Sequence, residues 1–456
     1  MLHAPRRIRN PEPVIRLTRA CHPFILFSST QTRKGNLMPI SQEERRIIRD
    51  LAARVADIAR HPVQEERKQL WMRLNRLERV RPLIHVQAIA PDIWEELIPP
   101  ATLRCTDAFC RGQELQLRRK IYCWENLQDD RVVDDVIVSP LVIRGDIANA
   151  GFGPRANIER SGARSGAHAY RTVIIAERDI EKINTTYQLS LDQAATDKSY
   201  QLFCDLYGGV LRVEKRGRDF FWFAPMDTFI QWRGIEPMFM DLLDRPKWIH
   251  EALERITAAW LNNLDQLEKL NALSLGNRNT MLGSGGYGWT DLLPQPDFAG
   301  QHVRLKDLWA RAATQIFTEG ISPEMHDEFA IQYEKRLLER FGFACYGCCE
   351  PLHRKVHVIR KIRNLRRVSM SPWVDIDIAS AAVGRDFVYT HKPNPAILSM
   401  EQWHPELARA ELRTALEKTR NNIVEVNLQD IHTVRNEPHR LKEWTRMAME
   451  LSRELA

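Results

Sequence analysis

Long apolar segments are missing from this 456-residue chain. A helix that crosses a bilayer needs roughly 18 or more predominantly apolar residues in a row, and no segment approaches that length. No repeat with a period of roughly 20–50 residues is present, which argues against a solenoid or a propeller. No Gly/Ser-rich or Pro-rich linker interrupts the later part of the chain, so no boundary of a second domain is evident.

Acidic residues are scarce only at the start of the chain. Residues 1–37 carry seven basic residues against Glu12, a net charge of +6, and the whole chain carries +7. The other 419 residues therefore sum to +1, and a basic nucleic-acid-binding face is not predicted. We interpret 1–37 as a disordered leader or as a mis-assigned start with initiation at Met38; a transit or signal peptide is the alternative.

Cysteine is too sparse for a disulfide framework. The eight cysteines are irregularly spaced over a long chain, unlike those of small secreted proteins. We therefore expect a reduced, cytoplasmic compartment in which one or two thiols are functional.

The pattern along the chain predicts an N-terminal helical segment and one large α/β domain. Ser41 and Glu44 form a capping box at the start of a helix that ends near residue 60. A second helix is expected over about 65–78, so that 38–80 form an N-terminal helical extension.

From residue 81 onward, apolar segments alternate with helical ones. The expected strands are 81–86, 135–142, 220–224, 273–275, 344–347, 367–371, 386–390 and 423–428. The expected helices are 246–269, 305–318, 323–340, 377–383, 406–421 and 438–455. Because no Gly-x-Gly-x-x-Gly follows the first strand, a dinucleotide-binding sheet is disfavoured. The prediction is a (β/α)₈ TIM-type barrel over 81–456, with its site at the carboxyl ends of the strands.

Three stretches resemble the uroporphyrinogen decarboxylase-like superfamily, and together they span roughly residues 65–456. They are Met-Asp-Leu-Leu-Asp-Arg-Pro at 240–246 before a long helix, Ile-Ser-Pro-Glu-Met at 321–325 before a cysteine-containing strand, and Asp-Ile-His-Thr at 430–433 before the last helix. The superfamily includes corrinoid methyltransferases, and cobalamin-independent methionine synthase is a relative. The resemblance implies a barrel enzyme with a small-molecule substrate.

The sequence departs from these families at two places. Trp-Met-Arg-Leu-Asn at 71–75 stands where the decarboxylases carry an arginine-rich substrate segment, which argues against a tetrapyrrole substrate. Cys-Tyr-Gly-Cys-Cys-Glu at 345–350 stands where the zinc methyltransferases have His-x-Cys.

The cysteines at 345–349 are the strongest local signal for chemistry. We predict Cys348 and Cys349 as zinc ligands, with Glu350 completing the site or acting as a catalytic group. Both sulfurs would face the same side only at a strand end or turn, because neighbours on a strand point to opposite faces. A zinc ion there would bind and activate a substrate thiol. The alternative is that these are small buried core residues.

Asp430 and His432 follow the last strand two residues apart, so their side chains share a face. His432 could ligate a metal or act as a general acid or base, with Asp430 orienting it, binding substrate or acting in catalysis. The resemblance places a distal zinc ligand near this strand and supports His432 in that role. A capping pair in the final loop is the alternative.

Other strand-end loops provide candidate substrate-binding residues. Lys392 is predicted to pair with a substrate carboxylate or phosphate, and a solvated loop is its alternative. His391, Asn394 and Trp373 would line the pocket, and the backbone of Gly286 in the Gly-rich segment 283–288 would cradle an anion, unless that segment is only a tight turn. The acidic cluster 128–135 is expected to be a solvated turn.

We expect a zinc-dependent methyltransferase acting between a methyl carrier and a thiol. No Asp-x-His-x-x-Gly cobalamin-binding motif is present, so a corrinoid would be carried by a partner protein. The alternatives are a carboxy-lyase of the same fold, in which Lys392, Asp430 and His432 steer a carboxylated substrate, and a scaffold protein without activity. A homodimer is left open.

Overall fold

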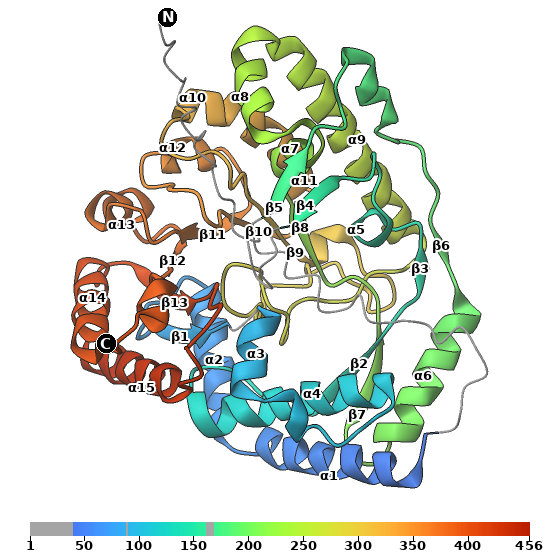
Figure 1. Cartoon of the computed structure of the whole chain (residues 1–456), viewed down its shortest axis with the longest axis vertical. Helices are drawn as coiled ribbons and strands as arrows, with labels where there is room; N and C mark the ends of the chain where they lie inside the picture. Colours follow the sequence, from blue (N-terminus) through green and yellow to red (C-terminus); the bar gives the residue numbers. More distant parts are fainter. Residues whose placement is uncertain (1–39, 88–89, 161–167) are drawn as a thin grey trace, which may run out of the picture.

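A parallel sheet forms the centre of the molecule (Figure 1). The computed structural model describes residues 40–87, 90–160 and 168–456; the predicted leader, 1–37, lies outside this range. The seven strands occur in the order β1-β13-β12-β11-β10-β9-β8, and every neighbouring pair is parallel. They are β1 (Leu83–Val86), β8 (Phe220–Phe223), β9 (Trp309–Ala312), β10 (Phe343–Tyr346), β11 (Leu365–Met370), β12 (Val388–His391) and β13 (Ile423–Leu428).

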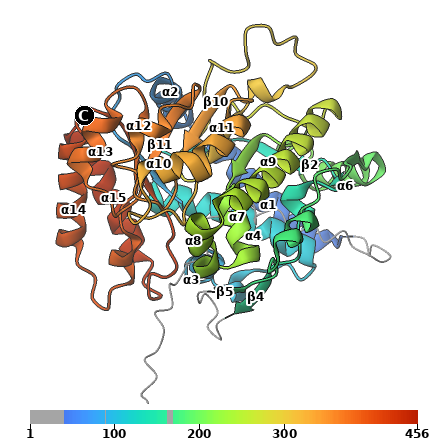
Figure 2. The ribbon, with the colours of Figure 1, turned by 90° about the horizontal axis from the view of Figure 1, so that it is seen from above.

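Helices cover the outside of this sheet. Seen from above, α13, α14 and α15 lie together on one side, and α1, α4 and α6 lie on the opposite side (Figure 2). The longer helices are α1 (Gln42–Ala59), α2 (Val63–Asn75), α3 (Pro91–Leu97), α4 (Ala108–Tyr122), α6 (Gln193–Tyr207), α7 (Pro225–Arg233), α8 (Ile235–Asp244), α9 (Pro246–Lys269), α11 (Gln332–Leu338), α13 (Ile376–Val383), α14 (Pro405–Lys418) and α15 (His439–Glu454). The short α5 (Ile147–Ala150), α10 (Pro323–His326) and α12 (Val356–Ile359) complete the α-helices of the described residues.

Alternation along β13 shows how the sheet separates two environments. All six residues of Ile-Val-Glu-Val-Asn-Leu are buried. Val424, Val426 and Leu428 join the main hydrophobic core under the helices, while Glu425 and Asn427 point to the other face and make polar contacts there. On β13 the inner face is therefore polar although it is buried. On β8, β9 and β10 the inner side also carries an apolar cluster that includes Trp222, Trp309 and Cys345. The polar part of the interior leads to the strand ends.

The closed eight-stranded barrel is not confirmed. Within the described residues the sheet has β1 and β8 as its two edges, and no pairing joins them. On the free side of β1, Asp130 Oδ2 accepts the N–H of Ile84 (2.7 Å) and Asp129 Oδ2 accepts the N–H of Val86 (2.9 Å). These two carboxylates satisfy donors that a closing strand would otherwise use. The confirmed part is an α/β fold with a parallel sheet.

The same contacts correct the prediction for the acidic cluster. Asp129 and Asp130 are each only 1% exposed, so they are not part of a solvated turn. Asp130 also accepts hydrogen bonds from the guanidinium of Arg81 (2.5 and 2.8 Å). Local sequence could not show that an uncovered strand edge lies opposite these acids.

A second correction concerns residues 305–318, which the sequence predicted as a helix. The segment instead contains β9, which pairs with β8 on one side and β10 on the other. Trp309, Ala310 and Ala312 are fully buried, and burial between two parallel strands overrides the helical preference of an Ala- and Leu-rich segment.

Residues between α4 and β8 form a separate small set of strands. β2 (Val136–Pro140), predicted as a barrel strand, pairs with β7 (Arg212–Arg216) outside the central sheet. Two short antiparallel pairs, β3 (Ile143–Arg144) with β6 (Ser190–Leu191) and β4 (Asn157–Arg160) with β5 (His168–Arg171), lie beside it. The predicted strand 273–275 is reduced to a single bridge between Leu273 and Arg218.

The N-terminal helices begin as the sequence predicts. Ser41 Oγ accepts the N–H of Glu44 (3.1 Å) and donates to its carboxylate (3.2 Å), which confirms Ser41 as the N-cap. The Glu44 carboxylate accepts the N–H groups of Thr106 (2.9 Å) and Asp107 (2.8 Å) rather than completing the capping box. α2 packs against the polar interior, where Trp71 and Asn75 are both fully buried.

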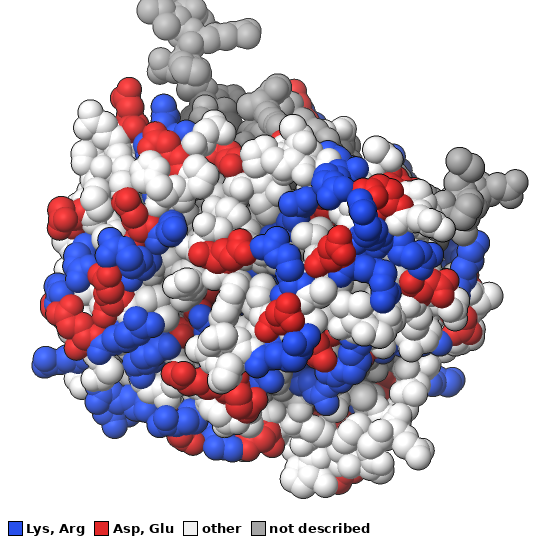
Figure 3. Space-filling model, turned by 90° about the horizontal axis from the view of Figure 1, so that it is seen from below, with Lys and Arg blue, Asp and Glu red and all other residues white. Residues whose placement is uncertain are grey.

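Two expectations from the sequence concern membrane-spanning helices and the charge of the surface. No helix of the described residues is long and apolar enough for a bilayer. On the face shown in Figure 3, basic and acidic side chains are interspersed, consistent with the near-neutral charge of the chain after its leader.

Candidate functional site

A glycine turn at the end of β10 places two sulfur atoms side by side. Gly347 follows the strand with φ +92°, and a Cβ there would lie 2.4 Å from Leu352 Cδ1 and 2.9 Å from Ser369 O, so only glycine fits. The turn breaks the alternation of the strand, and the sulfurs of Cys348 and Cys349 lie 3.5 Å apart. Cys348 is fully buried, while Cys349 is half-buried.

Contacts from two distant segments converge on Cys348. Ser284 Oγ lies 2.9 Å from its sulfur, and Lys392 Nζ lies 3.8 Å from the same sulfur. Lys392 also donates to the carbonyl oxygen of Cys348 (2.6 Å) and is only 2% exposed. An ammonium next to a sulfur stabilises negative charge on it.

Asp430 joins this group through Gln429. The Nε2 of Gln429 lies 3.1 Å from Ser284 Oγ and 3.1 Å from Asp430 Oδ2. Asp430 has φ +58° and so turns the chain out of β13. A chain of hydrogen bonds therefore runs from the Asp430 carboxylate to the sulfur of Cys348.

Glu350 fixes the turn that carries the cysteines. Its carboxylate accepts the N–H of Cys348 (2.9 Å) and of Thr314 (3.3 Å), and it is fully buried. Burial, followed by negative charge at Cys348, raises the pKa of Glu350. Glu350 therefore holds the backbone of Cys348 in place.

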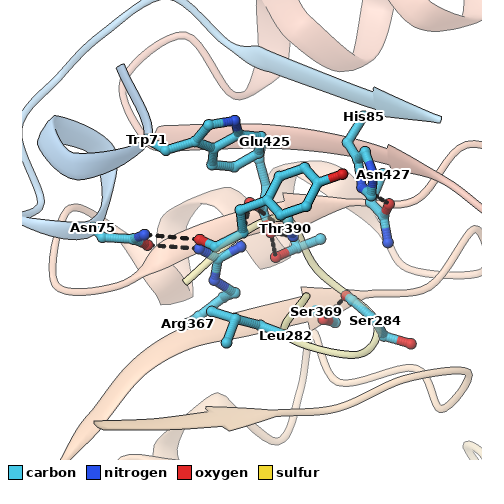
Figure 4. A network of polar contacts seen from close by, with 12 residues as sticks. Trp71, Asn75, His85, Leu282, Ser284, Arg367, Ser369, Thr390, Glu425 and Asn427 are labelled. Carbon is cyan, nitrogen blue, oxygen red and sulfur yellow. Dashed lines mark hydrogen bonds and ion pairs between the residues drawn. The ribbon is translucent and has the colours of Figure 1, made fainter. Parts of the chain in front are cut away.

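A buried ion pair of Arg367 and Glu425 lies near Thr390 and Asn75 (Figure 4). Arg367 contacts the carboxylate of Glu425, which also accepts from Thr390 Oγ1 (2.5 Å). Arg367 donates in addition to Asn75 Oδ1 (2.6 Å). Gly286 donates its N–H to both oxygens of Glu425 (3.2 Å each), so the backbone group predicted to cradle a substrate anion binds a carboxylate of the protein itself.

Arg311 ties the Gly-rich segment to the strand ends. Its guanidinium donates to Leu282 O, to Gly347 O and to Ser369 Oγ, each at 2.7 Å. Ser369 Oγ in turn donates to Ser284 O (2.6 Å). Arg311 therefore sets the relative positions of Gly347 and Ser284, the two elements that present Cys348 and its hydroxyl partner.

Two carboxyl groups near Glu350 hold protons close to neutral pH. Burial raises the pKa of Asp227 to about 7, with a smaller contribution from the charge of Glu350. Burial also raises the pKa of Glu334 to about 8, and its carboxylate accepts from Tyr346 OH (2.6 Å) and Thr314 Oγ1 (2.8 Å). Both are candidate proton donors beside the strand ends.

The structure places four other predicted site residues at strand ends and in the loops that follow. Trp373 is 68% exposed, and Asn394 accepts the N–H of Ala396 (3.0 Å) as a cap of the following turn. His391 is 7% exposed, and burial lowers its pKa to about 4. His432 is half-buried.

The predicted zinc site can be compared with the structure in two respects, the distance between the two sulfurs and the number of ligands. Two thiolates that share a tetrahedral zinc ion lie roughly 3.8 Å apart, given zinc–sulfur bonds of about 2.3 Å, and the spacing of 3.5 Å is similar. However, residues 40–87, 90–160 and 168–456 contain no group of three or more His, Cys, Asp or Glu placed to hold an ion. The donor set is therefore incomplete, and zinc stays a prediction.

Sequence reasoning missed Ser284, Gln429 and Arg311. Ser284 is flanked by glycines, and Cβ atoms at Gly283 and Gly285 would lie 2.4 Å from Trp222 and 2.8 Å from Arg311. A Gly-rich segment that opens no helix signals such close backbone approach. The side chains that approach it could not be named from the sequence.

Comparisons with known proteins add little. No protein-family model matches the chain, and no curated protein matches it in sequence. Among solved structures, a methyltransferase from Methanosarcina mazei is similar with a TM-score of 0.48 and 10% identity, over 84% of this chain and 98% of that one. A likeness this remote identifies neither fold nor activity.

Proposed function

We propose that this protein is an enzyme that transfers a methyl group between a methyl carrier and a thiol at the carboxyl ends of β10, β12 and β13. The observation that carries the proposal is the convergence of Ser284 Oγ and Lys392 Nζ on the sulfur of Cys348, with a second sulfur 3.5 Å away. Barrel-like parallel α/β enzymes place their chemistry at this end of the strands.

In the proposed reaction the acceptor sulfur attacks the methyl carbon. The new carbon–sulfur bond forms as the bond between methyl and carrier breaks, and the electron pair of the broken bond stays with the carrier. The acceptor thiol must first lose its proton, because the thiolate is the nucleophile.

The cysteine pair suits the removal of that proton. A cysteine sulfur and an acceptor thiol have similar proton affinity, so a proton moves between them with little change in free energy. Lys392 and Ser284 orient the sulfur of Cys348, and Glu350 holds its backbone. Zinc and a corrinoid partner remain predictions, and no step here passes through them.

An assay with methylcobalamin and a small thiol tests the proposal. We expect loss of methylcobalamin absorbance and formation of a methyl thioether detected by mass spectrometry. Cys348→Ser should lower the rate by at least about tenfold, whereas Cys204→Ser, on α6, should leave it unchanged. Equal rates in the wild type and Cys348→Ser would exclude a role for this sulfur. Zinc measured on the same samples tests the metal prediction.

A carboxy-lyase is the second candidate, supported by the buried acids. When carbon dioxide leaves, the electron pair of the broken carbon–carbon bond stays on carbon, and an acid must supply a proton there. Asp227, with its pKa raised to about 7, suits that role at neutral pH. Carbon dioxide release from a panel of carboxylated substrates, lost in Asp227→Asn and kept in Cys348→Ser, would favour this function over methyl transfer.

A further inference from the structure

We propose that Cys348 and Cys349 form an oxidisable thiol pair, in which a low-molecular-weight disulfide reacts at Cys349 and the sulfur of Cys348 then closes an intramolecular disulfide. The inference does not rest on methyl transfer. It rests on the spacing, burial and surroundings of the two sulfurs.

The two sulfurs are already in contact. They are 3.5 Å apart, and a disulfide bond is about 2.05 Å long, so a gap of roughly 1.5 Å remains. Because Cys348 and Cys349 are consecutive residues joined by a trans peptide, their Cα atoms lie about 3.8 Å apart, closer than the roughly 4.4–6.8 Å usual in disulfides. Closure therefore requires the backbone between them to rotate as well as the side chains. Within the part of the chain that the structure describes, none of the cysteines is in a disulfide.

The difference in burial between the sulfurs sets the order of the two steps. Thiol–disulfide exchange requires access to the attacking sulfur, and Cys349 is half-buried while Cys348 is fully buried. The external disulfide therefore meets Cys349 first. Cys348 is inaccessible to the reagent but lies in contact with the sulfur that has reacted.

The surroundings of Cys348 favour the second step. Negative charge develops on sulfur during exchange, and the ammonium of Lys392 lies 3.8 Å from the Cys348 sulfur. Ser284 Oγ, 2.9 Å away, gives a second polar partner. Both groups stabilise the charge as Cys348 attacks.

The reaction balances with the disulfide RSSR as the oxidant. The Cys349 sulfur attacks one sulfur of RSSR, and the bond between its sulfurs breaks as one RSH leaves. The Cys348 sulfur then attacks the Cys349 sulfur, the bond from Cys349 to the remaining RS group breaks, and a second RSH leaves. The protein loses two hydrogens, and RSSR is reduced to two thiols.

Closure alters the candidate site. Pulling Cys348 toward Cys349 breaks its contact with Ser284 and moves the backbone that Glu350 holds. A disulfide at this position would switch the site off until a thiol reductant reopens it.

Mass spectrometry of the full-length protein after exposure to oxidised glutathione, with EDTA present, tests the inference. Tryptic cleavage yields a peptide spanning 341–354 that contains Cys345, Cys348 and Cys349. We expect this peptide to lose two hydrogens and to carry no glutathione. Cys204, half-buried on α6, is an internal control that should retain glutathione as a mixed disulfide.

Two variants assign the bond and keep the inference falsifiable. Cys345→Ala should behave as the wild type, whereas Cys348→Ser should retain glutathione on Cys349. The inference is overturned if the wild-type peptide retains glutathione, or if it stays unmodified while Cys204 reacts. It is also overturned if Cys348→Ser still loses two hydrogens, or if Cys345→Ala does not. None of these readouts requires activity, so a failure of the proposed methyl transfer is a separate result.

Discussion

The ammonium of Lys392 donates a hydrogen bond to the carbonyl oxygen of Cys348 (2.6 Å) and lies 3.8 Å from the sulfur of the same residue. The two residues are 44 positions apart in the sequence. They meet because β12 and β10 are separated only by β11 in the sheet, and Lys392 follows β12 directly. This contact joins a predicted substrate-binding residue to a predicted metal ligand.

Removing the charge of Lys392 should slow closure of the cysteine pair. Lys392→Met keeps most of the side-chain volume and removes the ammonium that stabilises negative sulfur on Cys348. We expect the rate at which Cys348 displaces glutathione from Cys349 at pH 7.5 to fall by about tenfold relative to the rate of glutathione addition at Cys204, equivalent to about 1.4 kcal/mol. The rate is measured on the peptide 341–354, and Cys204 in the same sample reports any change in the reagent. An unchanged ratio of the two rates would contradict this role.

Replacing only one member of the Arg367–Glu425 ion pair should lower the stability of the fold strongly. Both side chains are at most 1% exposed, so Glu425→Gln leaves a buried guanidinium without its carboxylate and should lower the free energy of unfolding by about 3–5 kcal/mol. The exposed pair of Arg336 and Glu254 is the control, and Glu254→Gln should cost about 1 kcal/mol or less. Urea denaturation measures both.

A double variant separates charge from packing at this pair. Arg367→Met combined with Glu425→Gln removes both charges, and we expect it to be more stable than Glu425→Gln alone. If the double variant is as unstable as the sum of the single ones, the cost lies in packing around Gly286 and Trp71 rather than in an unpaired charge.

Gly286→Ala should destabilise the protein by overpacking. A Cβ at this position would lie 2.2 Å from Trp71 Cη2 and 2.8 Å from Glu425 Oε2, and both partners are buried. We expect a loss of about 1–3 kcal/mol in the free energy of unfolding. Gly112→Ala in α4 is the matched control: nothing lies within 4 Å of its Cβ position, and helix propensity predicts a gain of up to about 1 kcal/mol. Equal stability of the two variants would show that the Gly-rich segment has room to relax.

Acidification should weaken the fold through His391. Burial lowers the pKa of His391 from 6.5 to about 4, so between these values the unfolded chain binds a proton that the folded protein does not. The free energy of unfolding therefore falls as the pH falls from about 6.5 to about 4, and this contribution changes no further at lower pH. The expected loss is about 3 kcal/mol.

The variant His391→Phe isolates this contribution from those of other groups. Its stability should decline less steeply than that of the wild type across the same pH range, measured by urea denaturation at intervals of pH. Parallel curves for the two proteins would mean that His391 is protonated in the folded state.

Several elements were predictable because their signal is local. The helix predicted at 246–269 coincides with α9, and the strand predicted at 423–428 coincides with β13. The first has a continuous helical period after a proline, and the second is a short segment rich in β-branched residues. The N-cap at Ser41 was equally local, since Ser41 and Glu44 lie within one turn.

The candidate site was predictable only in part. Cys348, Cys349, Glu350, Lys392 and Asp430 were named from the sequence and lie in one connected set of contacts. The convergence of the cysteines with His432, predicted from spacing and resemblance, stays a prediction. Ser284 lies within the Gly-rich segment 283–288, but that segment is 64 positions from Cys348, and nothing in the sequence indicates that the two meet.

The sequence by itself determined which segments become strands and helices wherever hydrophobic period and caps agree, and it placed chemically active residues after the strands. Only the tertiary structure decided that β9 is a strand, that Asp129 and Asp130 cover the edge of β1, and that Gly286 faces Glu425 rather than a ligand. The physical reason is that these outcomes depend on which chain segments become neighbours in the sheet. A buried charge or an unpaired strand edge is satisfied by whichever polar group lies nearest in space. The number of residues between two groups in the sequence does not give that distance.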